Sequence, residues 1–244
     1  MKKIYTILMT LVLLAAALPL QAQTTVYYLD SDNDKQKAES ASELTSVSSG
    51  STGKEISGYW YATGSIEVKA PLIVSGEATL ILCDGASVEA MGCIVVEDNA
   101  TLTICVGATD SASTIKGTGK LLVTDDYNAT ADGVPGVNSD GSGKHANDGD
   151  NARIGSREDK QCGTINICGG TVEAYSTYTG SNVNGADIGS GQGGWGGTIN
   201  IYDGTVNCYG AQVKMECNMQ AACIGSGYEA TSDAPSSSTS TAAK

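Results

Sequence analysis

A repeat in the second half of the chain restricts the fold more than any other feature of the sequence. Its first segment reads Ala-Arg-Ile-Gly-Ser at 152–156, Ala-Asp-Ile-Gly-Ser at 186–190 and Ala-Cys-Ile-Gly-Ser at 222–226. The copies are 34 residues and then 36 residues apart. Repeats of roughly 20–50 residues are typical of units that bury their apolar faces by stacking on one another.

Each repeat unit contains two further segments in which polar and apolar residues alternate. Gly-Thr-Ile-Asn-Ile occurs at 163–167 and at 197–201, and Gly-Thr-Val at 170–172 recurs at 204–206. These segments are too short for helices and have the period of strands. We therefore predict an all-β fold in which each unit supplies the three sides of one coil of a parallel β-solenoid.

A shorter repeat precedes the motif. Residues 65–86 and 87–108 share nine identical positions at an offset of 22 residues. The same offset places Cys83 beside Cys105, either as a disulfide or as two free thiols. Alternation predicts three inward-facing ladders: Ile66 with Val88 and Ile115, Leu80 with Leu102, and Ile154 with Ile188 and Ile224.

The two ends of the chain differ in character from the repeats. A basic start at Lys2 and Lys3, an apolar run and a small-residue cleavage site predict a secretory signal peptide. A short helix is expected at 35–44. The predicted parts are a signal peptide at 1–22, an N-terminal strand and cap at 23–58, a β-helix at 59–228, and a disordered Ser/Thr-rich tail at 229–244.

Charge and cysteine content narrow the classes of partner. The formal net charge is −13, and removing Lys2 and Lys3 makes it −15. Such a chain is a poor partner for nucleic acid, and no segment of the mature chain is apolar enough to span a membrane. Eight Cys in an exported chain predict disulfides of open connectivity, and the lack of a Cys-x-x-Cys pair disfavours zinc. We expect an extracellular or outer-surface location, and the oligomeric state stays open.

The outward-facing residues of the repeat indicate a surface for carbohydrate. Thr164 and Asn166 are predicted to lie over their counterparts one repeat later, and Tyr175 is predicted to lie over Tyr209. Exposed aromatic rings beside amides and hydroxyls suit the faces and hydroxyl groups of sugars. The candidate carbohydrate-binding residues are Tyr175, Tyr209, Tyr202 and Trp195. The alternative is that these tyrosines only shield a corner of the fold.

Two further chemistries are weaker interpretations. Catalysis would require a base or a carboxylate pair, and the repeat positions offer Arg153 over Asp187, and Glu67 over Glu89, without a cluster of Asp and His. Calcium is a candidate cofactor because the loop at 124–151 is rich in hard oxygen ligands. Its candidate ligands are Asp140, Asp148 and Asp150, and the turn at 30–34 is a second acidic candidate.

The phrases Gly-Thr-Ile-Asn-Ile-Cys-Gly-Gly-Thr-Val-Glu-Ala and Gly-Ala-Asp-Ile-Gly-Ser-Gly resemble the glycine-rich β-solenoid repeats of large bacterial surface proteins and adhesins. They are also similar to calcium-containing, polysaccharide-binding β-helix proteins. The resemblance implies a secreted or surface-attached right-handed parallel β-helix with a binding or adhesive role. The rival functions are a polysaccharide lyase or glycoside hydrolase of the pectin-lyase-like type, and a structural stalk without a ligand.

Overall fold

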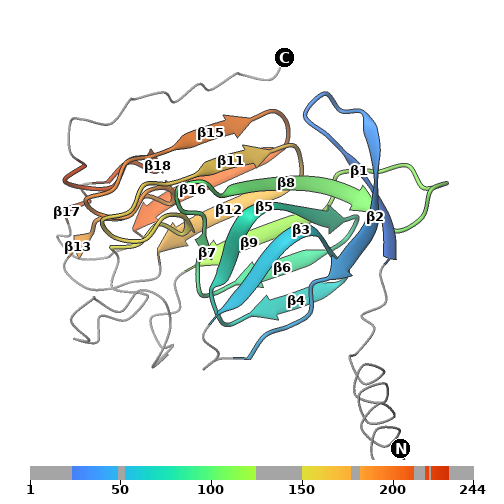
Figure 1. The fold of residues 1–244 in the computed structure, drawn as a ribbon, viewed down its shortest axis with the longest axis horizontal. Coiled ribbons are helices and arrows are strands. Elements are labelled where there is room, and N and C mark those ends of the chain that lie inside the picture. Colours follow the sequence, from blue (N-terminus) through green and yellow to red (C-terminus); the bar gives the residue numbers. More distant parts are fainter. Residues whose placement is uncertain are drawn as a thin grey trace, which may run out of the picture.

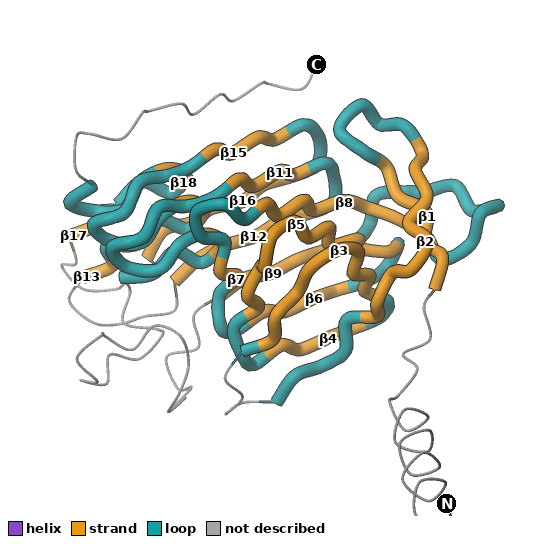
Figure 2. The backbone as a smooth tube through the Cα atoms, in the orientation of Figure 1, coloured by secondary structure: helices purple, strands orange, loops and turns teal. Residues whose placement is uncertain are grey.

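The computed structural model shows an all-β protein built largely from parallel strands (Figures 1 and 2). No α-helix occurs in the parts of the chain that it describes, and none of those parts includes a helix long and apolar enough to cross a membrane. The described residues are 24–48, 53–124, 150–176, 182–211, 218–219 and 221–230. The predicted signal peptide, most of the predicted tail, Asp140 and Asp148 lie outside them.

The parallel strands pair in three rows, and two of the rows are joined because β3 and β5 bend from one into the other. The first row consists of β3 (Lys54–Ala62), β5 (Leu72–Cys83), β7 (Ile94–Val95), β10 (Ile154–Gly155), β14 (Ile188–Gly189) and β18 (Ile224–Gly225). The second row consists of β2 (Lys35–Glu43), β3, β5, β8 (Thr101–Ala108), β11 (Thr164–Ile167) and β15 (Thr198–Ile201).

The third row forms a separate sheet of β4 (Ser65–Val68), β6 (Ser87–Ala90), β9 (Lys120–Thr124), β12 (Thr171–Ser176) and β16 (Thr205–Ala211). A short pair, β13 (Asn182–Val183) with β17 (Asn218–Met219), lies apart from the three rows. From β4 onward the chain visits the third, first and second rows in that order, and it repeats this order with each return. Neighbouring strands in a row therefore come from successive passages of the chain.

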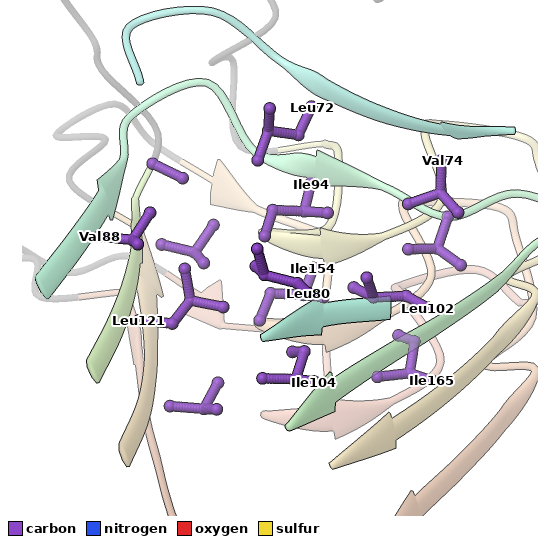
Figure 3. Close-up of a cluster of buried hydrophobic side chains, with 14 of the residues drawn as sticks. Leu72, Val74, Leu80, Val88, Ile94, Leu102, Ile104, Leu121, Ile154 and Ile165 are labelled. Carbon is purple, nitrogen blue, oxygen red and sulfur yellow. The ribbon is translucent and has the colours of Figure 1, made fainter. Parts of the chain in front are cut away.

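Alternation along each strand places the aliphatic side chains between the rows. The residues buried between the rows form one continuous core, mainly of Ile, Leu, Val and Ala from all three rows (Figure 3). The predicted ladder of Ile154, Ile188 and Ile224 is confirmed, because the three residues pair in parallel register. The same ladder continues through Ile94 to Leu72.

Two other predicted ladders need correction. Ile66 does pair with Val88, but the next member is Leu121 rather than Ile115, which lies in the loop before β9. An inserted loop at 109–119 delays the return of the chain to the third row. The end of this loop is held by Asp84, whose carboxylate accepts hydrogen bonds from the backbone N–H groups of Lys116 (2.8 Å) and Thr118 (3.1 Å).

Leu80 pairs with Ile104 rather than with Leu102, which instead lies opposite Ala78. The corner between the first and second rows is two residues longer after Val96 than after Val74, and it contains the turn at Asn99 (φ 65°). An offset of 22 therefore holds between β5 and β7 and becomes 24 between β5 and β8. Because the difference is even, the same faces of the strands stay buried.

The helix expected at 35–44 is wrong, because residues 35–43 form strand β2. Strand β2 returns antiparallel to β1 (Thr24–Leu29), and β1 also pairs antiparallel with the end of β8. The hairpin covers the outer face of the second row, where Val26, Ala38 and Ala41 bury Ile81 and Tyr61 in a small second core. The burial of Ala38 and Ala41 against this face outweighs the helical propensity of the segment.

Candidate functional site

Polar side chains line the outer face of the second row in a regular column. Thr79, Thr103, Asn166 and Asn200 occupy matching positions on β5, β8, β11 and β15. The Asn200 amide donates a hydrogen bond to Asn166 Oδ1 (2.9 Å), and the Asn166 amide donates to Thr103 Oγ1 (3.3 Å). The register predicted from sequence for Asn166 over Asn200 is therefore confirmed, and the amides form a hydrogen-bonded chain across three strands.

A groove of about 250 Å³ lies over three residues of this column, Thr79, Thr103 and Asn166. It lies between the sheet and the turn of the N-terminal hairpin, because Tyr28 near the end of β1 pairs with Gly107 of β8. Its lining consists of Tyr28, Asp30, Ser31, Thr79, Thr103, Cys105, Asn166, Cys168 and Tyr202. The groove is somewhat smaller than the roughly 300–1,000 Å³ of sites for drug-sized ligands, so it suits one ring-sized unit of a larger molecule.

Two aromatic side chains contribute to the groove lining. Tyr202 follows β15, is 39% exposed, and has its backbone fixed by an N–H bond to the Ile167 carbonyl (2.8 Å). Tyr28 is half-buried, and its ring lies 5.9 Å from that of Tyr59 between centroids. Burial, followed by a hydrogen bond to Tyr59, raises the pKa of the Tyr28 phenol. Its hydroxyl therefore stays neutral and able to donate at ordinary pH.

Asp30 contributes a carboxylate to the groove and holds the turn of the hairpin. Its Oδ1 accepts the backbone N–H groups of Asp32 (3.0 Å) and Asp34 (2.9 Å), and its Oδ2 accepts the Gln36 amide (2.7 Å). The backbone hydrogen bond from Asp34, above all, lowers the pKa of Asp30. The charged carboxylate and the turn geometry therefore stabilise each other.

The structure divides the predicted carbohydrate-binding residues among different places. Tyr202 lies in the groove, whereas Tyr175 and Tyr209 lie on the third row, with rings 6.0 Å apart and 83° between their planes. A register shift after Ala174 accompanies this perpendicular contact, so the two rings do not form a flat ladder. Trp195 is half-buried in the loop before β15.

The groove residues that sequence reasoning missed are those whose proximity depends on the hairpin. Tyr28 and Asp30 are more than seventy residues from Thr103 in the sequence, and no repeat links them. The sequence did indicate the outer face, because polar residues such as Thr79 and Thr103 alternate with apolar ones along their strands. It did not indicate which segment lies above that face.

Of the three loop aspartates predicted as calcium ligands, only Asp150 is among the described residues. It is buried, and its Oδ1 accepts a hydrogen bond from the Asn184 amide (2.8 Å), which also donates to Gln192 Oε1 (2.9 Å). No group of three or more His, Cys, Asp or Glu that could hold a metal occurs in the described parts of the chain. Carboxylate and amide oxygens are nevertheless the donor types that calcium prefers.

The residues considered for catalysis stack as predicted. Ile154 pairs with Ile188, which sets Arg153 beside Asp187, and both side chains are buried (1% and 2% exposed). Glu67 pairs with Glu89 on the third row, and Glu67 forms an ion pair with Lys69 at 3.0 Å. Arg153 and Asp187 are therefore covered by the fold, whereas Glu67 is an ion-paired side chain at the surface.

The predicted pairing of Cys83 with Cys105 is wrong, for the same reason as the Leu80 register. Cys83 lies opposite Gly107, and Cys105 lies opposite Ile81. On its other side Cys105 is next to Cys168 of the following passage, because Ile104 pairs with Ile167. A hydrogen bond links the two thiols and is the first cause, ahead of burial, of a raised pKa at Cys105.

Comparisons with protein families, with curated proteins and with solved structures find no match to this chain.

Proposed function

We propose that the described strands form a right-handed parallel β-helix with three sides per coil. The support is the constant order in which the chain visits the three rows, together with in-register pairing of the repeated Ile-Gly and Thr-Ile-Asn-Ile segments. Connections between parallel strands of one sheet are right-handed in about 98% of cases, which favours that hand. The short strands and glycine corners suit narrow coils of aliphatic residues.

We propose that this β-helix is an exported or surface-attached module that binds carbohydrate without cleaving it. The observation that carries the proposal is the hydrogen-bonded chain of Asn200, Asn166 and Thr103. Two members of this chain, Asn166 and Thr103, line the groove together with Tyr28 and Tyr202. Amides and hydroxyls at fixed spacing satisfy sugar hydroxyls, and aromatic rings contact the apolar faces of sugar rings. The partner would be a glycan or a cell-surface polysaccharide.

The regular spacing of the column favours an extended polysaccharide over a single small sugar. Strands of one row lie about 4.8 Å apart, so an array of Thr and Asn side chains repeats at that interval. A linear glycan that contacts this column outside the groove would add hydrogen bonds beyond the one ring that the groove holds. Affinity should therefore increase from mono- to oligosaccharides.

A glycan array followed by analysis of the products tests this function. The chain without residues 1–22 is applied to the array, and each bound polysaccharide is then incubated with the protein and separated by size. Binding without depolymerisation supports the proposal. Release of shorter sugars would assign a lyase or hydrolase instead, and no binding at millimolar oligosaccharide would leave a structural stalk.

A further inference from the structure

Cys105 of β8 lies directly opposite Cys168, the residue that follows the last residue of β11. Cys168 donates its backbone N–H to the Ile104 carbonyl (2.8 Å), which fixes the parallel register of the two strands at this point. Strand spacing in such a pair is about 4.8 Å, inside the Cα separation of roughly 4.4–6.8 Å that a disulfide allows. Both side chains are free thiols, buried at the floor of the groove, and hydrogen-bonded to each other.

We propose that Cys105 and Cys168 are a dithiol that oxidises to a disulfide, which joins the strands before and after the insert at 125–149. This pairing does not depend on the groove holding a glycan. Neither thiol has another cysteine beside it in the row, since Ile81 flanks Cys105 and Tyr202 follows Cys168 in register. The choice of partner is therefore set by strand register rather than by a search among the eight cysteines of the chain.

The electrostatics of the pair favours Cys168 as the attacking thiol. The hydrogen bond from Cys105 lowers the pKa of Cys168, whereas burial raises the pKa of Cys83 to about 11 and that of Cys162 to about 12. Thiolates, not thiols, attack disulfides, so Cys83 and Cys162 should react slowly. Cys168 is also 4% exposed, while Cys105 is fully covered.

The oxidant would be an external disulfide, of a small molecule or of a thiol oxidoreductase. The Cys168 thiolate attacks one sulfur of this disulfide, and the first external thiolate leaves. Cys105 then loses its proton and attacks the Cys168 sulfur, which breaks the mixed disulfide and expels the second external thiolate. The two protons of the pair end on the two external thiols, and the protein is oxidised by two electrons.

Peptide mapping without reduction tests the pairing in the full mature chain. The protein is equilibrated with oxidised glutathione, its free thiols are alkylated, and it is digested after Lys, Arg and Glu. Cys105 then lies alone in the peptide 98–116, and Cys168 lies with Cys162 in the peptide 161–173. The expected product is these two peptides joined, with fragmentation that locates the bond at Cys168. Alkylation of Cys105 and Cys168 in the oxidised sample, or a bond of either to another cysteine, would overturn the proposal.

Melting temperatures of the oxidised and reduced protein, and of two cysteine variants, provide a second test of the pairing. Oxidation closes a long loop of the unfolded chain and should raise the melting temperature by about 10 °C relative to the reduced protein. In Cys105→Ser, the increase in melting temperature on oxidation should be smaller than in the parent protein, because the Cys105–Cys168 bond cannot form. Cys162→Ser, which removes another buried cysteine, should show the same increase as the parent protein. An equal rise in Cys105→Ser and in the parent protein contradicts the pairing.

Discussion

Ile154 lies directly opposite Ile188 in parallel register, and both side chains are fully buried. They belong to a ladder in which each residue comes from a different passage of the chain through the first row. The ladder ends at Ile224, which is 41% exposed because no described strand covers it. Equivalent positions of one repeat therefore differ in burial only through their place in the stack.

This difference predicts unequal effects of the same substitution. Ile154→Ala should lower the free energy of unfolding by about 2–5 kcal/mol, because it leaves a cavity between covered neighbours. Ile224→Ala should lower it by roughly 1 kcal/mol or less, since much of that side chain is already in water. Urea denaturation of both variants measures the two values. Equal losses would show that Ile224 is covered in the folded protein.

Gly155 and Gly225 provide a second matched pair at the end of the same motif. Both have positive φ, +145° and +131° respectively. A Cβ at Gly155 would overlap the carbonyl oxygen of Gly189, whereas at Gly225 its nearest neighbour would be Ala222 Cβ at 3.6 Å. Gly155→Ala should therefore prevent folding or lower the melting temperature far more than Gly225→Ala. Circular dichroism melts compare them, and similar melts would contradict the close approach of the two strands.

The identical segments of the longer repeat were sufficient to predict that their strands pair in register and which of their faces are buried. Ile154 over Ile188, and Thr164 over Thr198, follow from identical segments, because a strand repeated in sequence stacks on its own copy. Corner lengths were not predictable in this way. Leu80 and Leu102 are identical in the sequence alignment of the shorter repeat, but they do not pair. The corner before Leu102 is two residues longer than the corner before Leu80, so Leu80 pairs with Ile104.

The groove was only half predictable for a related reason. The column of Asn166 and Asn200 is a repeat feature and was expected on the outer face. The hairpin that brings Tyr28 and Asp30 above this column has no copy elsewhere in the chain, and a short helix was expected where its strand β2 lies. Packing of Val26 and Ala38 against Ile81 decides its position, and such a contact between distant segments leaves no local pattern in the sequence.

The two aromatic surfaces can be separated by substitution. Tyr202→Ala and Asn166→Ala should each weaken binding of an oligosaccharide by about 3- to 10-fold, since each removes one ring contact or one hydrogen-bond position. Tyr209→Ala, on the third row, should leave the affinity unchanged. Isothermal titration with the oligosaccharide chosen on the array measures all three. Loss of affinity in Tyr209→Ala alone would move the site to the Tyr175–Tyr209 pair.

Acid should loosen the hairpin through Asp30. The pKa of this carboxyl is lowered in the folded protein, so its contribution to stability is present above the ordinary pKa of an aspartate. The contribution is lost as the pH falls through the lower, folded value. Glycan affinity should therefore decrease below about pH 4, as the turn beside the groove loses its charged acceptor. Asp30→Asn should show weaker binding at neutral pH and a flatter pH profile. An unchanged profile in this variant would place the acid-sensitive group elsewhere.

Calcium is the predicted cofactor, and Asp150 is the described residue of its predicted loop site. The described oxygen donors around Asp150 include the side chains of Asn184 and Gln192, and the remaining predicted ligands are Asp140 and Asp148. A cation that binds the folded protein stabilises it by mass action, by about 2.7 kcal/mol at a concentration one hundred times its Kd. The melting temperature should therefore rise by roughly 5–11 °C between chelator and saturating calcium.

The triple variant D140N/D148N/D150N tests where the cation binds, because it keeps the shape of each side chain and removes the charge. The rise should disappear in this variant and persist in a control that carries Asn at Asp30, Asp32 and Asp34. Equal melting temperatures of the parent protein in calcium and in chelator would remove calcium as a cofactor. A rise that survives in the triple variant and is lost in the control would assign the cation to the hairpin turn, beside the groove.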